Sequence, residues 1–356
     1  MTTLAELLTA PLPTTEEEVW RYSRIDELDL SRYETGGTEL TWRHGDLGRA
    51  TVEKIAVDIA ESTDPLHQLH RAMAPKAVVI DVPAGVVIAD PIEVRYTGAR
   101  DGKATAPHLI IRAGADSEVR VVETFDGGGD GLVLHRTIIE AGASARVGYL
   151  GIQDLGPTTW ALGTLEADAG AQATITLGLA GFGGDYARVR TDCRLLGRGA
   201  TGDLFAAYFG DGTQTLDYRT FQEHVAPDTT SNLLFKGVVG DSSRSVYTGL
   251  IRVGKDARGT NAFQTNRNIK LSDDAWAESV PNLEIENNDV HCSHASAVGP
   301  IDEEQRFYLE SRGVPTAQAE RLIVAGFFDE VFSGFPVDRR PDLEAAVGRK
   351  LQAALA

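Results

Sequence analysis

One short stretch of the chain gathers side chains that could bind a metal. Cys292, one of two cysteines, lies between His291 and His294 in the sequence VHCSH. A thiolate and an imidazole are good ligands for iron or zinc, and histidine exchanges protons near neutral pH. In an extended segment Cys292 and His294 would share one face, with His291 on the other. Two ligands are too few for a closed metal site, so a metal here would need further ligands, for example from another chain.

The same residues also have a purely structural interpretation. Free cysteine is among the most buried residue types, so Cys292 could be a small packed hydrophobe beside hydrogen-bonded histidines. From the spacing alone this interpretation is the commoner one. No other motif competes: the glycines at 127–129 precede Asp130 rather than a Lys-Ser/Thr pair, so they form no phosphate loop.

The composition is that of a folded protein and limits its partners. The 356 residues are 42% hydrophobic and carry a formal charge of −18, which argues against nucleic acid or an anionic membrane surface as a partner. Two cysteines are too few for a disulfide framework. The N-terminus lacks the basic start of a secretory signal, and the apolar run 322–328 is too short to span a bilayer. We expect a cytoplasmic protein.

Short β-rich runs separated by small-residue turns begin at about Ala77 and predict the fold. The turn glycines Gly114, Gly142, Gly170 and Gly199 follow one another at steps of 28, 28 and 29 residues. A repeat of this length with two or three strands is typical of a parallel β-helix or a similar β-solenoid. A β-sandwich is the alternative, and Asp-Gly pairs that could form hairpins keep it open. The repeat is longer than a hairpin pair needs, which favours the solenoid.

The two ends of the chain have a different pattern from this β-rich middle. We expect a mixed, partly helical region over 1–75, a parallel β-helix core over 76–298 and a helical region over 299–356. Beyond Ile301, apolar residues at spacings of three and four predict helices. These helices could close the end of the solenoid, bind another subunit, or do both.

The stretch around Cys292 closely resembles the signature of the SufB/SufD family of iron–sulfur cluster assembly proteins. The matching segments are NDVHCSH at 288–294, AVG at 297–299 and IDEEQRFYLESRG at 301–313, with further likeness at 20–26, 82–87, 89–92, 162–165, 222–224 and 235–238. The resemblance implies a right-handed parallel β-helix between N- and C-terminal helical regions. It also implies a non-catalytic scaffold subunit, in which SufB and SufD pair through their β-helices and each holds SufC, an ABC-type ATPase, on its C-terminal helices.

The resemblance further indicates the SufD branch and the residues that would act. The segment matching the cysteine-containing one of SufB-like chains, AFQTNRN at 262–268, has no cysteine here. Cys292 and His294 match the family's Cys-Ser-His triplet, with Ala295 where many relatives have glycine. His294 is therefore the stronger candidate for cluster assembly, as a metal ligand shared with the partner chain or as a proton carrier. We expect no tightly bound cofactor on this chain alone, only a transient iron–sulfur cluster at the SufB–SufD interface.

The resemblance also places ATPase docking on the C-terminal helices. The apolar residues proposed to contact the ATPase are Phe307, Tyr308, Leu322, Phe327 and Phe328. Without its paralogue, the chain could pair with itself. The alternative to the scaffold is a β-helix carbohydrate-active enzyme, which would need carboxylates or calcium along one face of the solenoid.

Overall fold

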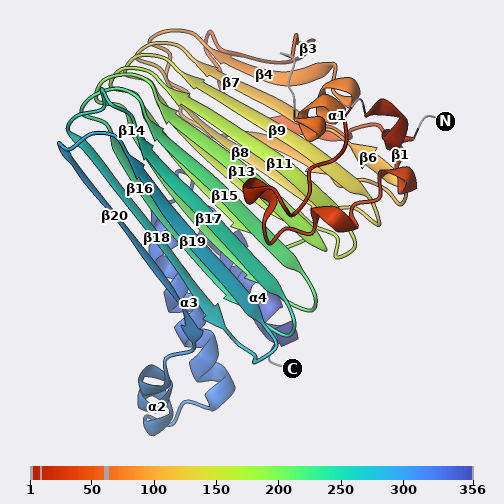
Figure 1. Ribbon diagram of the computed structural model, residues 1–356, viewed down its shortest axis with the longest axis vertical. Helices are drawn as coiled ribbons and strands as arrows, with labels where there is room; N and C mark the ends of the chain where they lie inside the picture. Colours follow the sequence, from red (N-terminus) through yellow and green to blue (C-terminus); the bar gives the residue numbers. More distant parts are fainter. Residues whose placement is uncertain (1–2, 9, 60–63, 355–356) are drawn as a thin grey trace.

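The computed structural model describes residues 3–8, 10–59 and 64–354, and most of them form a solenoid of two facing β-sheets (Figure 1). Strands alternate between the sheets along the chain, so each pair of strands makes one coil, and eight coils follow one another. Sheet A contains β4 (Lys76–Val82), β7 (His108–Ala113), β9 (Leu132–Ala141), β11 (Trp160–Ala169), β13 (Tyr186–Leu195), β15 (Thr215–His224), β17 (Arg244–Val253) and β19 (Trp276–Ile285). Sheet B contains β5 (Ile92–Thr97), β8 (Glu118–Gly127), β10 (Arg146–Leu155), β12 (Thr174–Gly181), β14 (Thr201–Gly210), β16 (Thr230–Val239), β18 (Thr260–Lys270) and β20 (Val290–Pro300).

The predicted parallel β-solenoid is confirmed, because these strands pair in parallel with the strands of the coils before and after. The small turn residues have a steric reason. A Cβ on Gly142 would lie 3.0 Å from the carbonyl oxygen of Ala113, and one on Gly170 would lie 3.0 Å from that of Ala141. Each turn therefore stacks directly on the backbone of the preceding turn, which keeps glycine at the repeat length seen in the sequence.

The N-terminal region closes the first coil and covers part of sheet A. Strand β2 (Leu40–Arg43) pairs antiparallel with β5, and β3 (Thr51–Ala56) with β4. The region also contains β1 (Glu34–Thr35), the 3₁₀ turns η1 (Leu4–Leu7), η2 (Glu18–Trp20), η3 (Ile25–Glu27) and η4 (Leu30–Arg32), and helix α1 (Pro65–Met73); β6 (Lys103–Thr105) pairs with β1. The Asp64 side chain caps α1 by accepting from the backbone N–H of Leu66 and His67.

The C-terminal helices lie on the outer face of sheet B and beyond it. Helices α3 (Thr316–Gly334) and α4 (Arg340–Ala354) pack Val324, Phe328 and Leu351 against outward apolar residues of the sheet such as Phe182 and Phe209. Helix α2 (Glu303–Ser311) has no buried residue, packs on α3, and projects past the last strands (Figure 1). None of the helices described is both long and apolar enough to cross a membrane.

The carboxyl group of Glu123 is buried in the interior of the early coils. Thr137 Oγ1 and Tyr149 OH donate to its Oε2 at 2.7 and 2.6 Å. Burial raises the pKa of Glu123 from 4.5 to about 7, against the opposing effect of these two hydrogen bonds.

This raised pKa predicts how stability depends on pH. The unfolded chain loses the Glu123 proton near pH 4.5 and the folded chain only near 7, so the free energy of unfolding falls as pH rises through this window. The total loss is roughly 3 kcal/mol, at about 1.4 kcal/mol per pKa unit. Glu123→Gln keeps an acceptor for Thr137 and Tyr149 and should flatten this dependence in urea titrations. Exposed Glu140→Gln should preserve it, and an unchanged slope in Glu123→Gln would disprove the assignment.

Candidate functional site

The solenoid ends in an open coil formed by β19 and β20, the last strands of the two sheets. Residues in interior rows, buried in earlier coils, are exposed here. Val253 is fully buried, whereas Ile285, the next residue in its row, is 44% exposed; Asn268 is 4% exposed and its neighbour Val298 is 42% exposed. Within the described chain no further strand pairs with β19 or β20. The end of the solenoid thus offers two unpaired backbone edges around an uncovered interior.

Cys292 and His294 both lie on the interior side of this open coil. On β20 they stand next to Ala262 and Gln264 of β18, whose side chains point into the solenoid and are buried. Cys292 packs partly into a small apolar cluster that includes Ile251, whereas His294 is exposed. His291 lies on the outward side. The structure therefore places the expected pair on one face, with His294 the more accessible of the two.

The electrostatics of the two cysteines differ from those of reactive thiols. Burial raises the pKa of Cys292, opposed by a hydrogen bond to the backbone of Ala262. Burial also raises the pKa of Cys193, which lies in the solenoid core, to about 12. Both side chains are therefore protonated thiols near neutral pH, and Cys292 would have to lose its proton to bind a metal.

Three further polar residues around the open coil were not predicted from the sequence. Ser296 Oγ donates to Ser279 Oγ at 2.7 Å, which links β20 to β19 across the opening. Gln264, beside His294, is 1% exposed, and neither of its amide atoms has a hydrogen-bond partner among the described residues. Only the register between strands brings these side chains together, and no local sequence motif marks them.

The described residues contain no group of three or more His, Cys, Asp or Glu side chains arranged to hold a metal ion. At the open coil the thiol and imidazole of Cys292 and His294 are the expected donors. They lie on the interior side of the last coil, which no further coil of the described chain covers, so side chains of a second molecule could approach them.

The five residues expected to dock a partner differ in how exposed they are. Phe307, Tyr308 and Leu322 are 70%, 58% and 49% exposed and lie on the neighbouring helices α2 and α3, and exposed apolar side chains that are grouped in this way mark interaction surfaces. Phe328 is fully buried between α3 and sheet B. The prediction that Phe328 contacts a partner at the surface does not fit the structure. Helical spacing assigned it to an apolar stripe, and at Phe328 this stripe faces sheet B instead of solvent.

Phe327 is partly buried and is contacted by a buried lysine. Lys236 of β16, 4% exposed, donates to the Phe327 carbonyl oxygen at 2.8 Å and pairs with Glu330 at 2.6 Å. Its Nζ also lies 4.8 Å from the centre of the Phe327 ring. Beside this contact, a hollow of about 1200 Å³ runs between α2, α3 and the ends of β18 and β20, lined in part by Tyr308 and Leu322.

Comparison with known proteins identifies the class to which this fold and site belong. Residues 95–327 match the family described as the SUF system FeS cluster assembly SufBD core domain. A SufBD-family iron–sulfur cluster assembly protein of Mycobacterium tuberculosis is 33% identical over 96% of this chain and 90% of the relative. The chain therefore belongs to the SufBD family of iron–sulfur cluster assembly proteins, as the stretch around Cys292 predicted.

Two further relatives indicate the branch of the family. The iron–sulfur cluster assembly protein SufD of Bacillus subtilis is 30% identical over 87% of this chain and 71% of its own length. The SufD protein of Escherichia coli is 36% identical over 42% of this chain and 36% of its own length. The chain is thus a member of the SufD branch.

Proposed function

We propose that this chain is a non-catalytic scaffold subunit of a cytoplasmic SufBCD-type complex. The observation that carries the proposal is the open last coil, where β19 and β20 expose their edges beside Cys292 and His294. In the proposed complex a SufB-like paralogue adds its own strands to these edges, and a nascent iron–sulfur cluster is built or received between the two chains.

The physical argument for pairing comes from the edges themselves. An unpaired strand edge carries a row of backbone donors and acceptors that readily pairs with another strand. Covering it would also bury apolar side chains left exposed in this coil, such as Ile285 and Val298. In the absence of the paralogue, a second copy of this chain could occupy the same edges, since both chains would offer the same open coil.

The chemistry of the interface follows from its donors. His294 supplies an accessible imidazole and Cys292 a thiol that becomes a ligand once deprotonated. Because this chain supplies only two ligands, the remaining coordination positions of a metal ion are left for sulfide and for side chains of the partner. The cluster is cargo in this proposal, held while both chains are together.

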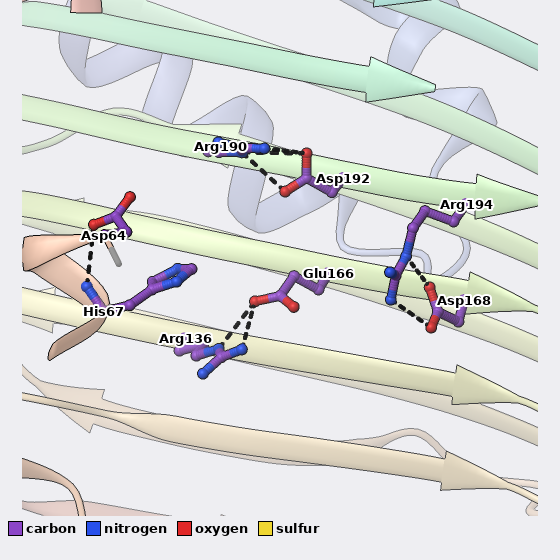
Figure 2. Close-up of polar contacts among 8 residues, drawn as sticks. All are labelled: Asp64, His67, Arg136, Glu166, Asp168, Arg190, Asp192 and Arg194. Carbon is purple, nitrogen blue, oxygen red and sulfur yellow. Dashed lines mark hydrogen bonds and ion pairs between the residues drawn. The ribbon is translucent and has the colours of Figure 1, made fainter. Parts of the chain in front are cut away.

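The charges of sheet A weaken the case for the carbohydrate-active alternative. On its outer face Glu166 pairs with Arg136, Asp192 with Arg190 and Asp168 with Arg194, the last through two contacts of 2.6 Å (Figure 2). Carboxylates held by arginine in this way form a structural ladder and are poor general acids or bases.

A SufC-like ABC ATPase is proposed to dock at α2 and α3. Exposed Tyr308 and Leu322 line the hollow there, and exposed Phe307 lies on the same helix as Tyr308. Helix α2, without a buried residue of its own, would gain its apolar contacts from the partner.

Co-expression of the chain with its SufB-like and SufC-like partners, followed by affinity purification and assays of iron and sulfide, tests this function. We expect a stoichiometric complex that carries iron only when the SufB-like chain is present. Leu322→Asp should lose the ATPase, with affinity reduced about 30-fold for a hot spot of about 2 kcal/mol, and should keep the SufB-like chain.

Val87→Asp is the matched control, because Val87 is 63% exposed near the opposite end of the solenoid. It should retain both partners. A wild-type chain that purifies alone and free of iron in the presence of both partners would refute the scaffold function.

A further inference from the structure

A small hollow lies where α1 and η2 cover the outer face of sheet A, far along the chain from the open coil. Its volume is about 50 Å³, and it is lined by residues of α1, η2, β9, β11 and β13. Pockets that hold drug-sized ligands have volumes of about 300–1,000 Å³. A hollow of this size suits a small oxyanion and excludes a nucleotide or a large cofactor.

The floor of this hollow is a row of three residues in register. Arg136 of β9 lies beside Thr164 of β11, and Thr164 lies beside Arg190 of β13. Adjacent strands are about 4.8 Å apart, so two long cationic side chains flank one hydroxyl. The His67 ring reaches from α1 over the strand between the two arginines (Figure 2).

Both arginines keep hydrogen-bonding capacity for a ligand. Arg136 binds Glu166 through Nε and Nη2, and Arg190 binds Asp192 through the same two nitrogens. No hydrogen bond or ion pair engages Nη1 of either arginine among the residues that the structure describes. The carboxylates thus orient each guanidinium, which has five N–H donors, and leave one end of it open.

The positive charges of the arginines help to lower the pKa of His67, which lies above them. Burial lowers the pKa of His67, and the charges of Arg136 and Arg190 add to this effect while Asp64 and Glu166 oppose it. Burial lowers the pKa of His70, which also lines the hollow, to about 4. The imidazoles are therefore neutral, and the arginines supply the positive charge of the hollow.

Two side chains on the outer side of sheet A that line the hollow have a buried polar atom without a hydrogen-bond partner in the described chain: Thr164 Oγ1 and His70 Nδ1. Such groups are costly to bury and call for a ligand or an ordered solvent molecule. His70 Nε2 lies 3.1 Å from the Pro107 carbonyl oxygen. Because that oxygen can only accept, Nε2 carries the proton and Nδ1 is an acceptor.

We propose that this hollow binds a phosphate group, either as free hydrogen phosphate or as the head of a small phosphomonoester. Its oxygens accept from Nη1 of Arg136 and Arg190 and from the Thr164 hydroxyl. Free hydrogen phosphate keeps one proton, which it donates to Nδ1 of His70. Sulfate is fully deprotonated at neutral pH and cannot make this hydrogen bond, and a phosphomonoester, with a second pKa of about 6, relies on the arginine and threonine contacts alone. The site is independent of the proposed scaffold function.

Isothermal titration of the full chain at constant ionic strength, with inorganic phosphate, glycerol phosphate or sulfate, tests this site. Phosphate should bind saturably and sulfate more weakly. Arg190→Gln should weaken phosphate binding about tenfold or more, as expected for a charge-assisted hydrogen bond. Arg194→Gln is its matched control, since Arg194 lies on the same strand, also pairs with a carboxylate and lies outside the hollow (Figure 2).

Thr164→Val separates ligand binding from folding, because the hydroxyl has no partner in the fold. It should weaken phosphate binding without lowering the unfolding temperature, whereas Thr176→Val on the opposite sheet should change neither. Tighter binding of glycerol phosphate would identify a phosphomonoester, and tighter binding of inorganic phosphate the free ion. No saturable binding to the wild type, or binding that survives both Arg190→Gln and Thr164→Val, would overturn the proposal.

Discussion

Asp217→Asn is expected to lower the free energy of unfolding by roughly 3–5 kcal/mol, the usual effect of breaking a buried ion pair. Asp217 is fully buried and binds Arg188 at 2.8 Å and Arg219 at 2.9 Å, and those arginines are 3% and 1% exposed. Tyr186 OH also donates to it at 2.9 Å. Asparagine would leave two buried guanidinium ions sharing no counter-charge, which is why the effect should be large.

The same substitution should release the N-terminal segment from the solenoid. Arg188 donates to the Val19 carbonyl oxygen at 2.8 Å and stacks on Trp20, and Arg219 donates to the Arg21 carbonyl oxygen. These bonds depend on arginines that Asp217 holds in place. We expect limited proteolysis near residues 19–21 in Asp217→Asn under conditions where the wild type is resistant.

The contribution of Asp217 to the free energy of unfolding depends on pH with a definite sign. Burial pushes the pKa of Asp217 up, but Arg188 and Arg219 outweigh it and hold the pKa below its ordinary value of 3.8. The stabilisation is therefore present above pH 3.8 and is lost as pH falls through the lower, folded-state pKa. Asp168→Asn removes a partly exposed partner of Arg194 and should cost less than about 1 kcal/mol. A similar small loss in Asp217→Asn would show that the buried network is not what anchors the segment.

His294→Ala is expected to yield a complex that assembles normally yet retains at least about tenfold less iron and sulfide, by analogy with the loss of a residue that supports a metal site. The His294 side chain is exposed on the interior side of the open coil and makes no hydrogen bond to the described residues, so its removal should not disturb the fold. The measurement is iron and sulfide per complex after purification with both partners, together with the unfolding temperature of the isolated chain.

His291→Ala provides the comparison, because His291 belongs to the same strand and points to the opposite side. It should leave cluster loading unchanged. Cys292→Ser, in which a poorer ligand replaces the thiol, distinguishes ligation from packing: a loss of cluster as large as in His294→Ala would make Cys292 a ligand. Full loading in His294→Ala would remove that histidine from the assembly site.

The sequence by itself determined the architecture and the position of the candidate site along the chain. The glycine spacing of 28 and 29 residues specified the coil length, because a Cβ at these turns would press against the turn of the preceding coil. The Cys-Ser-His triplet placed Cys292 and His294 on one side of a strand through the two-residue alternation of extended chain. Both are local properties of the chain, so a local pattern could reveal them.

Tertiary structure decided which of these residues are accessible and which distant residues join them. Whether an inward-facing residue is buried depends on a following coil, so Gln264 is covered and His294, one coil later, is open. Helical spacing could not show that Phe328 faces sheet B, because the partner of a helix face is chosen by packing. The Asp217 network and the phosphate hollow join the N-terminal segment to strands more than a hundred residues away, and no periodicity along the chain encodes such contacts.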